Sequence, residues 1–281
     1  MALVQKKIKK VYLGSTQVRP DIALYSTDIT LATQDQSIQP TSISNNRCID
    51  VSSDWCHILL SNETWPVYEY TLSAPRDLSS TITSQTANLK TKTYTDCVVY
   101  SEDGSYIYIN NTSSGTGAGY SVIEQRQLST PFDISTASSI VYSKTTNNGE
   151  RVGGFQFYNN GLNLIGATRD GKILSWTLST AWNISTLWNL TVQYQSVTWD
   201  SIWNWFAISP DGMTCYCVAE WMSQIQQFDT LYPYDFSQNT STTRSASFGS
   251  FNFGLKVSPD WHYLFLTTQN GTIYRYTFSL N

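Results

Sequence analysis

The chain has 281 residues, of which 41% are hydrophobic, so it is long and apolar enough to bury a substantial core. Charged residues make up only 14%, against about 25% in ordinary globular proteins, so serine, threonine, asparagine and glutamine must supply most of the polar surface. The net charge is −4 and the one basic cluster is Lys6–Lys10, which argues against a nucleic-acid partner.

Residues 1–19 stand apart from the rest of the chain. Their first part, MALVQKKIKKVYLGS, lacks the apolar run that a secretory signal needs, and no segment of the chain is long and apolar enough to span a membrane. We therefore expect synthesis in the cytoplasm without a signal peptide, and no membrane insertion. Residues 1–19 are either an added strand or an anchoring arm that docks on another protein, and residues 20–281 form one domain.

From residue 49 onward the sequence repeats. The same turn recurs as Asp54 in VSSDWCHILL, Asp103 in YSEDGSYIYI, Asn160 in FYNNGLNLIG, Asp211 in ISPDGMTCYC and Asp260 in VSPDWHYLFL, at spacings of 49, 57, 51 and 49 residues. Sixteen residues after a turn stands an aromatic residue, at Tyr70, Trp176 and Tyr276. A third phrase follows as APRDLSS, TPFDIST, TAWNIST and YPYDFSQ.

A period near 50 residues with about four strands per unit is typical of a β-propeller. We therefore predict an all-β, five-bladed β-propeller of four-stranded repeats. Its five inner strands are expected at Ile49–Ser52, Cys97–Tyr100, Gly154–Phe157, Phe206–Ser209 and Gly254–Val257. Outer strands such as SSIVYSK show the alternation expected when one face meets water. No helix is predicted, and the ambiguous segment Trp221–Thr230 is interpreted as strand.

The last repeat ends after its third strand, Ile273–Phe278. The segment PDIALYSTDITLATQ, which begins at Pro20, aligns with PFDISTASSIVYSKTT of the second repeat. We therefore expect the N-terminal segment around Ile22–Thr33 to supply the missing fourth strand and close the ring, which removes the open edges.

The recurring polar residues are interpreted as scaffold. The turn residue, aspartate or asparagine, recurs in all five repeats, and Asp77, Asp133, Asn183 and Asp235 recur at one further place, as capping side chains do and catalytic acids do not. His57 and His262 occupy equivalent places after Asp-Trp, without further residues at metal-ligand spacing, so neither a metal site nor a cofactor is expected. The cysteines Cys48, Cys56, Cys97, Cys215 and Cys217 are expected to be buried free thiols.

An enzymatic alternative remains open. Five-bladed propeller glycosidases use acidic groups around the central channel, and the acids that do not follow the repeat are Glu102, Glu150, Asp200 and Glu220.

The features that break the repeat are aromatic. The connections between second and third strands, and between a fourth strand and the next first strand, share one rim of a propeller, called here the loop rim. The candidate partner-binding residues there are Trp65, Tyr120, Trp199, Trp203 and Trp221. Such rings provide contact area for sugars or proteins, and the alternative is that they pack between blades. The remaining connections form the opposite rim, the turn rim.

The combination of Ser-Pro-Asp-Gly-type turns, strands such as IYRYTFS and phrases such as TPFDIST resembles a repeat family of bacteriophage and other virion-associated propellers. The resemblance covers about residues 20–281. It departs from the pattern at Trp55 and Trp261, where glycine is usual, and in the first three turns, which lack proline.

The resemblance brings no catalytic residues and implies a virion structural protein, of capsid or of tail spike or fibre type, without catalytic activity. Such a protein attaches to a host surface glycan or protein, or to another virion protein through residues 1–19. The alternatives from other classes are a lectin-like propeller with one sugar site per blade and the propeller glycosidase.

Overall fold

The computed structural model describes most of the chain from Asp28 onward, together with Tyr12–Leu13 and Thr16–Gln17 near the N-terminus. The residues outside the description are 1–11, 14–15, 18–27, 40–42, 44, 64–65, 81, 90, 93, 113–119, 147–150, 169–170, 196–202, 220–223, 231, 238–243, 249–251, 259, 261 and 279–281.

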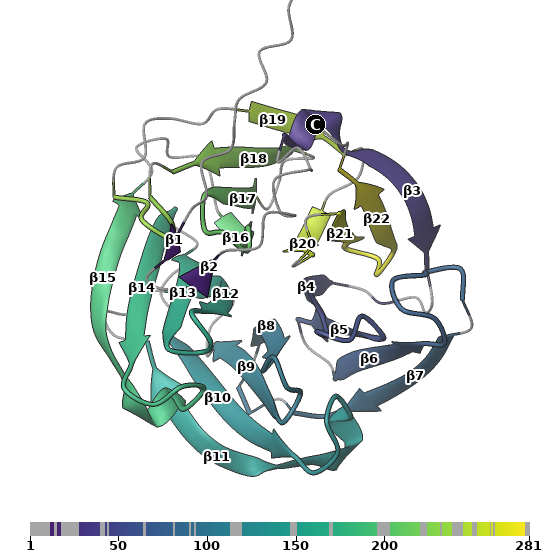
Figure 1. The fold of residues 1–281 in the computed structure, drawn as a ribbon. Helices are drawn as coiled ribbons and strands as arrows, with labels where there is room; N and C mark the ends of the chain where they lie inside the picture. The colour runs from purple at the N-terminus through teal and green to yellow at the C-terminus, as the bar shows by residue number, and fades with distance from the viewer. Residues whose placement is uncertain are drawn as a thin grey trace, which may run out of the picture.

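Five four-stranded antiparallel sheets stand around a common centre, so the molecule is a five-bladed β-propeller, as the repeat predicts (Figure 1). Blade 1 contains β4 (Asn46–Val51), β5 (His57–Asn62), β6 (Val67–Leu72) and β7 (Ile82–Ala87). Blade 2 contains β8 (Tyr94–Tyr100), β9 (Tyr106–Thr112), β10 (Ser121–Leu128) and β11 (Ala137–Thr145). Blade 3 contains β12 (Val152–Tyr158), β13 (Asn163–Thr168), β14 (Lys172–Leu178) and β15 (Leu187–Gln195).

Blade 4 contains β16 (Trp203–Ile208), β17 (Thr214–Ala219), β18 (Gln224–Asp229) and β19 (Arg244–Ser247). Blade 5 contains β20 (Asn252–Val257), β21 (Tyr263–Thr268), β22 (Ile273–Thr277) and β3 (Thr33–Ile38). The first strand of each blade lies nearest the centre and the fourth at the periphery (Figure 1). The predicted inner strands are therefore confirmed, and the ambiguous segment before Thr230 contains β18.

Blade 5 takes its outer strand from the other end of the chain. β3 pairs antiparallel with β22, with Thr33 opposite Thr277 and Ile38 opposite Ile273. The closure by an N-terminal strand is confirmed, but its predicted position, Ile22–Thr33, is wrong, because the strand starts only at Thr33.

The displacement has a simple cause. The segment contains two similar phrases seven residues apart, Pro20-Asp21-Ile22 and Thr27-Asp28-Ile29. The second of these occupies the repeat position in the structure: the Asp28 carboxylate accepts a hydrogen bond from the Thr30 backbone N–H (3.0 Å) and caps a short 3-10 helix, η2 (Ile29–Leu31).

Equivalent 3-10 helices, which the sequence did not predict, precede two other outer strands: η3 (Ile134–Thr136) and η4 (Ile184–Thr186). Asp133 and Asn183 cap them, each accepting from the backbone N–H two residues on at 3.0 Å. Asp77 and Asp235 accept in the same way, which confirms the capping role predicted for all four residues.

The core lies between the blades. The residue after each capping side chain is inserted there and is 0 to 1% exposed, namely Ile29, Leu78, Ile134, Ile184 and Phe236. Strands of neighbouring blades complete these clusters; Ile58 and Tyr70 of blade 1, for example, pack with Phe265 and Ile273 of blade 5. No blade buries its faces alone, so the five blades stabilise one another.

Within residues 1–19 the structure describes one small feature. β1 (Tyr12–Leu13) and β2 (Thr16–Gln17) pair antiparallel as a two-stranded sheet. The role of this arm in anchoring stays a prediction.

Candidate binding surface and central channel

The turn aspartates are structural. Asp54, Asp103 and Asp211 each accept a hydrogen bond from the backbone N–H two residues on, at 2.9 to 3.0 Å. Each also accepts from the serine hydroxyl two residues before it. These bonds fix the turn between first and second strands, as an Asx turn does. The scaffold interpretation of this position is confirmed.

A second contact on the turn rim links the turn to the phrase that precedes the outer strand. In blades 2, 3 and 4 an aromatic ring lies on the glycine of the turn, in the pairs Phe132 on Gly104, Trp182 on Gly161 and Tyr234 on Gly212. The backbone N–H of the aromatic residue donates to the carbonyl of that glycine at 2.8 to 3.1 Å. We call this arrangement the ring-on-glycine clasp.

Blade 1 reverses the clasp. Trp55 stands where glycine is usual and adopts the left-handed conformation, with φ of 66°. Its partner is Arg76, whose guanidinium carbon lies 4.7 Å from the Trp55 ring centroid and whose N–H still donates to the Trp55 carbonyl (3.0 Å). The departure from the repeat pattern is therefore compensated by exchanging the ring and its partner.

Neighbouring blades are tied by a side chain on the third strand. Glu69, 1% exposed, accepts hydrogen bonds from the Ile134 backbone N–H and from the Tyr100 hydroxyl, both at 2.9 Å. Gln125 accepts in the same way from Ile184 (3.1 Å), and Gln227 from Ile29 (2.9 Å). Each of these acceptors lies one blade before its donor, so we call the residue the junction acceptor.

His57 belongs to the junction of Glu69. Its Nδ1 lies 3.1 Å from Glu69 Oε1, and this hydrogen bond raises the pKa of His57 above its ordinary value, against the opposing effect of burial. The second histidine, His262, lies 3.2 Å from Asp260 Oδ2. Across the described residues there is no group of three or more histidine, cysteine or acidic side chains that could hold a metal ion.

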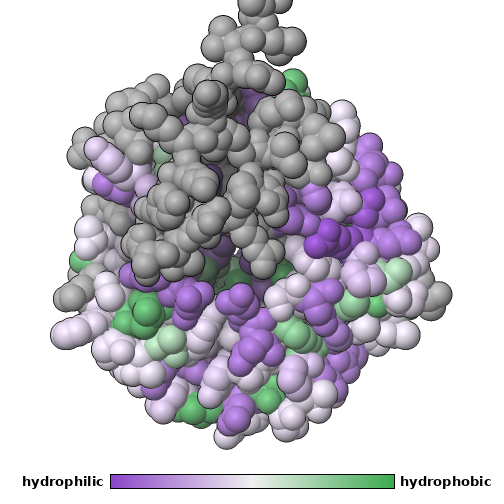
Figure 2. All heavy atoms as spheres, in the orientation of Figure 1, coloured by the Kyte–Doolittle hydropathy of each residue, from purple (hydrophilic) through white to green (hydrophobic). Residues whose placement is uncertain are grey.

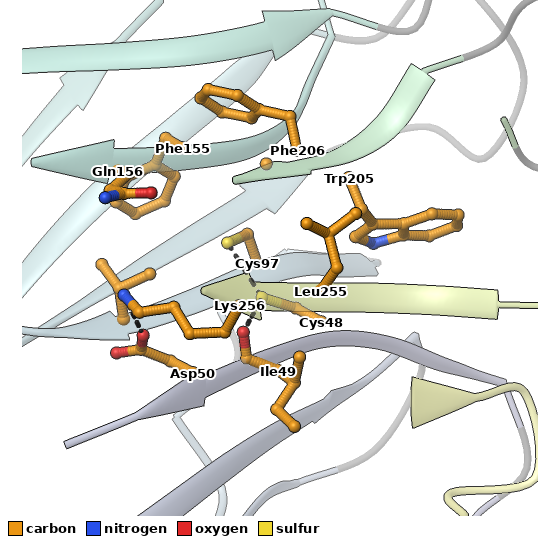
Figure 3. A pocket seen from close by; sticks show the side chains of 12 residues that line it. Cys48, Ile49, Asp50, Cys97, Phe155, Gln156, Trp205, Phe206, Leu255 and Lys256 are labelled. Carbon is orange, nitrogen blue, oxygen red and sulfur yellow. Dashed lines mark hydrogen bonds and ion pairs between the residues drawn. The ribbon is translucent and has the colours of Figure 1, made fainter. Parts of the chain in front are cut away.

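The first strands of all five blades line a small central cavity of about 20 Å³, which has room for about one water molecule (Figure 3). One equivalent position, six residues before the turn, directly follows a register shift in every first strand. It is occupied by Cys48, Cys97, Gly154, Trp205 and Gly254.

The residues at this position differ greatly in size. Trp205, which is 2% exposed, lines the cavity together with Gly154. A Cβ on Gly254 would lie 2.7 Å from the Ile49 nitrogen, so the backbones of β20 and β4 meet there without a side chain between them. The remaining two positions bring two thiols together, with 3.1 Å between Cys48 Sγ and Cys97 Sγ.

Two residues further along the strands, the channel is polar. Asp50 Oδ2 accepts from the Tyr100 N–H of the next blade (2.9 Å), and Lys256 Nζ lies 2.7 Å from Asp50 Oδ1 (Figure 3). Gln156 Oε1 accepts from the Ile208 N–H (3.3 Å). These side chains link adjacent first strands, so they stabilise the contact between neighbouring blades.

Among the residues that line the cavity, Asp50 is the one carboxylate. Of the acids that kept the glycosidase alternative open, Glu102 lies exposed in the turn between β8 and β9, on the turn rim. Glu150, Asp200 and Glu220 lie outside the described residues.

Of the five predicted loop-rim aromatic residues, the structure describes Tyr120 and the backbone of Trp203. Tyr120 directly precedes β10 and is 43% exposed. Trp203 is the first residue of β16, and its side chain is not described. Trp65, Trp199 and Trp221 lie outside the described residues, so their role in binding stays a prediction.

The sequence missed a second exposed apolar surface, on the periphery. β11 exposes three consecutive residues, Ile140, Val141 and Tyr142, at 38 to 43%, and β15 of the next blade exposes Trp188 at 59%. The predicted alternation of SSIVYSK is wrong, because five residues in a row on this strand are exposed. Blades diverge with distance from the centre, so both faces of an outer strand can reach water.

These two outer strands are also the longest. β11 and β15 have nine residues each, against six in β3 and β7 and four in β19. Figure 2 shows the described part of one face as mostly hydrophilic to neutral, with hydrophobic residues in separate spots. Other exposed large hydrophobic residues are Tyr232, Leu31 and Leu162. None of the described helices has the length and apolar character needed to cross a membrane.

No protein-family model matches this sequence, and no curated protein matches it. Solved structures resemble it in fold. The β-propeller domain of Cps50 (Swd1) from Myceliophteria thermophila superposes with a TM-score of 0.54 at 10% identity, over 88% of this chain and 100% of that one. The WD40 repeats of RRP9 give a TM-score of 0.51 at 11% identity, over 92% and 99% of the two chains.

A chain of the mitotic checkpoint complex gives a TM-score of 0.53 at 12% identity, over 98% and 99%. The repeat spacing of this chain, 49 to 57 residues, exceeds the roughly 40–45 residues of a WD40 repeat. At these identities the likeness is one of architecture: the chain has the fold of a β-propeller.

Proposed function

We propose that this protein is a non-catalytic binding propeller that serves as a structural protein of a virus particle, where it contacts a host surface or another particle protein. The observation that carries the binding role is a contrast within the molecule. The central channel leaves only about 20 Å³ free and its Asp50 and Lys256 are paired with each other, whereas large apolar side chains are exposed on the outside.

The exposed apolar surface suits a protein partner. The exposed residues lie on the outer edge strands of two neighbouring blades: Ile140, Val141 and Tyr142 on β11, and Trp188 on β15. An edge strand offers free backbone N–H and C=O groups to an added strand, and aromatic rings are the side chains that most often anchor protein interfaces. On the loop rim, exposed Tyr120 supports the second contact surface that the sequence predicts.

The support for a virus particle as the setting is the resemblance of the repeat phrases to virion-associated propellers. Low charge and abundant serine, threonine and asparagine fit a surface that is made in a cytoplasm and exposed later. The WD40 propellers share the architecture alone and lend no argument for or against this setting.

Two experiments test the proposal. Particles purified from an infected host culture should contain the chain, and antibodies against it should label intact particles. Recovery of the chain only in host complexes free of particles would exclude the virion role.

The binding role is tested with surface variants of the full chain. The double variant Tyr142→Ser with Trp188→Ser and the single variant Tyr120→Ala should each weaken particle or cell binding while leaving the melting temperature unchanged. The matched control is Trp176→Ala, which removes a ring that is 2% exposed and should cost about 3–5 kcal/mol of stability. Unchanged binding by both surface variants would refute these surfaces as contact sites.

A further inference from the structure

Two thiols from neighbouring blades face each other in the central channel. Cys48 of β4 and Cys97 of β8 hold the same repeat position, 49 residues apart, and their Sγ atoms lie 3.1 Å from each other (Figure 3). Both side chains are buried, at 5% and 2% exposure. The ring of blades therefore positions the two sulfur atoms, and no movement of a loop is needed to bring them together.

The channel limits what can reach these thiols. Its free volume of about 20 Å³ has room for about one water-sized molecule, and Trp205 is among the side chains that line it. Hydrogen peroxide is only one oxygen atom larger than water, so it is the oxidant that comes nearest to this size. A bulky disulfide such as oxidised glutathione is far too large.

We propose that Cys48 and Cys97 form a redox modification site, at which a small hydroperoxide converts the thiol pair into a disulfide between blades 1 and 2. The inference does not depend on the proposed function. It follows from the equivalence of the two positions and from the contact between their sulfur atoms.

The reaction balances with hydrogen peroxide as the oxidant. One thiol loses its proton and its sulfur attacks a peroxide oxygen, so the O–O bond breaks, a sulfenic acid forms and hydroxide leaves. The second sulfur, also losing its proton, attacks the sulfenic sulfur, so the S–O bond breaks, the S–S bond forms and a second hydroxide leaves. The two released protons convert both hydroxides to water, and two electrons have passed from the thiols to the peroxide.

Burial makes this site slow to react. It raises the pKa of the Cys97 thiol well above its ordinary value, and the thiolate is the nucleophilic form. The pair therefore resists brief exposure and responds to sustained peroxide.

The chain contains a natural comparison pair. Cys215 and Cys217 are also buried, with 3.5 Å between their Sγ atoms, but they lie on one strand, β17. Two residues along an extended strand are separated by roughly 6.6 Å between Cα atoms and project in parallel, at the limit of what a disulfide spans. We expect Cys48 and Cys97 to cross-link and this pair to stay reduced.

A disulfide at the channel would close a loop that contains nearly the whole of blade 1. Because the loop begins on β4 and ends on β8, the bond would hold the first strands of two blades together and restrict the unfolded chain. The oxidised protein should therefore melt at a higher temperature than the reduced one.

The test uses the full chain, purified with reductant, desalted and exposed to hydrogen peroxide. Remaining thiols are alkylated in denaturant, and the digest is analysed by mass spectrometry. We expect one linked species containing Cys48 and Cys97, two hydrogen atoms lighter than the sum of its reduced peptides. We also expect a raised melting temperature that dithiothreitol reverses.

The variants separate the two pairs. Cys217→Ser should keep both the cross-link and the rise in melting temperature, and Cys97→Ser should lose both. If Cys97→Ser fails to fold, the peptide map of the unsubstituted protein decides alone. Alkylation of both Cys48 and Cys97 after sustained peroxide, with oxidation confined to half-buried Cys56 or to the Cys215–Cys217 pair, would overturn the proposal.

Discussion

The ring-on-glycine clasp makes a quantitative prediction at Gly161. This glycine has φ of 78°, and a Cβ added to it would lie 2.3 Å from two atoms of the Trp182 ring. Gly161→Ala therefore imposes two costs. The left-handed backbone costs an L-residue roughly 1–2 kcal/mol, and forcing an extra methyl into a filled site typically adds about 1–3 kcal/mol.

The Trp182 ring has little freedom to move away. It is half-buried, packs against the core and lies 5.0 Å from the Phe157 ring between centroids. We therefore expect Gly161→Ala to lower the free energy of unfolding by about 2–5 kcal/mol, the sum of these two costs. Urea unfolding followed by both tryptophan fluorescence and circular dichroism measures it and checks that the transition is cooperative.

A double-mutant cycle separates the two costs. In Gly161→Ala with Trp182→Ala the steric overlap is gone and the backbone cost remains. The double variant should therefore be more stable than the sum of the single effects predicts, by about 1 kcal/mol or more. A loss below about 0.5 kcal/mol for Gly161→Ala, or strict additivity in the cycle, would refute the clasp.

Three further predictions concern other contacts. Removing residues 1–39 should abolish most of the stability, because β22 loses its partner β3, and a melting temperature equal to that of the full chain would refute the closure. The buried pair of Arg151 with Asp96, joined by two hydrogen bonds of 2.5 and 2.9 Å, predicts a loss of about 3–5 kcal/mol for Arg151→Met, and adding Asp96→Leu should recover part of it; no recovery would show that the unpaired charge is not the cause. The raised pKa of His57 means that protonation stabilises the fold, an effect complete below the unfolded pKa of about 6.5 and lost as pH rises through the folded value. The stability lost in His57→Gln should therefore be larger at pH 6 than at pH 9, and a loss that is independent of pH would exclude the link to Glu69.

The repeat was enough to predict the number of blades, because each turn carries an aspartate or asparagine and the hydrogen bonds of the turn aspartates are local. Asp54, Asp103 and Asp211 act within a few residues of their own position, so their role can be inferred from the sequence. The pairing of the two thiols could also have been predicted from the repeat. Cys48 and Cys97 both stand six residues before a turn, and adjacent blades place such positions side by side.

What the sequence could not predict depends on contacts between distant segments. The phrase around Asp21 is as good a match as the one around Asp28, and only the pairing of β3 with β22 decides between them. Likewise, alternation in SSIVYSK is expected only where one face of the strand is covered. The blades diverge toward the periphery, so β11 exposes residues on both of its faces.

The closing strand also replaces a lost junction acceptor. At the position of Glu69, Gln125 and Gln227, the last blade carries Arg275, which has donors only and so accepts nothing from the next blade. Gln36 of β3 takes over: its Oε1 accepts from the Leu78 backbone N–H of blade 1 (2.8 Å).

Arg275 acts as a donor, not as an acceptor, at the seam, which is the junction between the last and first blades. Its guanidinium pairs with Asp35 of β3 at 2.6 Å and donates to the Arg76 carbonyl of blade 1. The junction between the last and first blades thus requires β22 from the C-terminal end, β3 from the N-terminal end and the phrase around Arg76. Because these three segments are separated by up to about 240 residues, the seam joins the two ends of the repeat array and couples the last blade to the first.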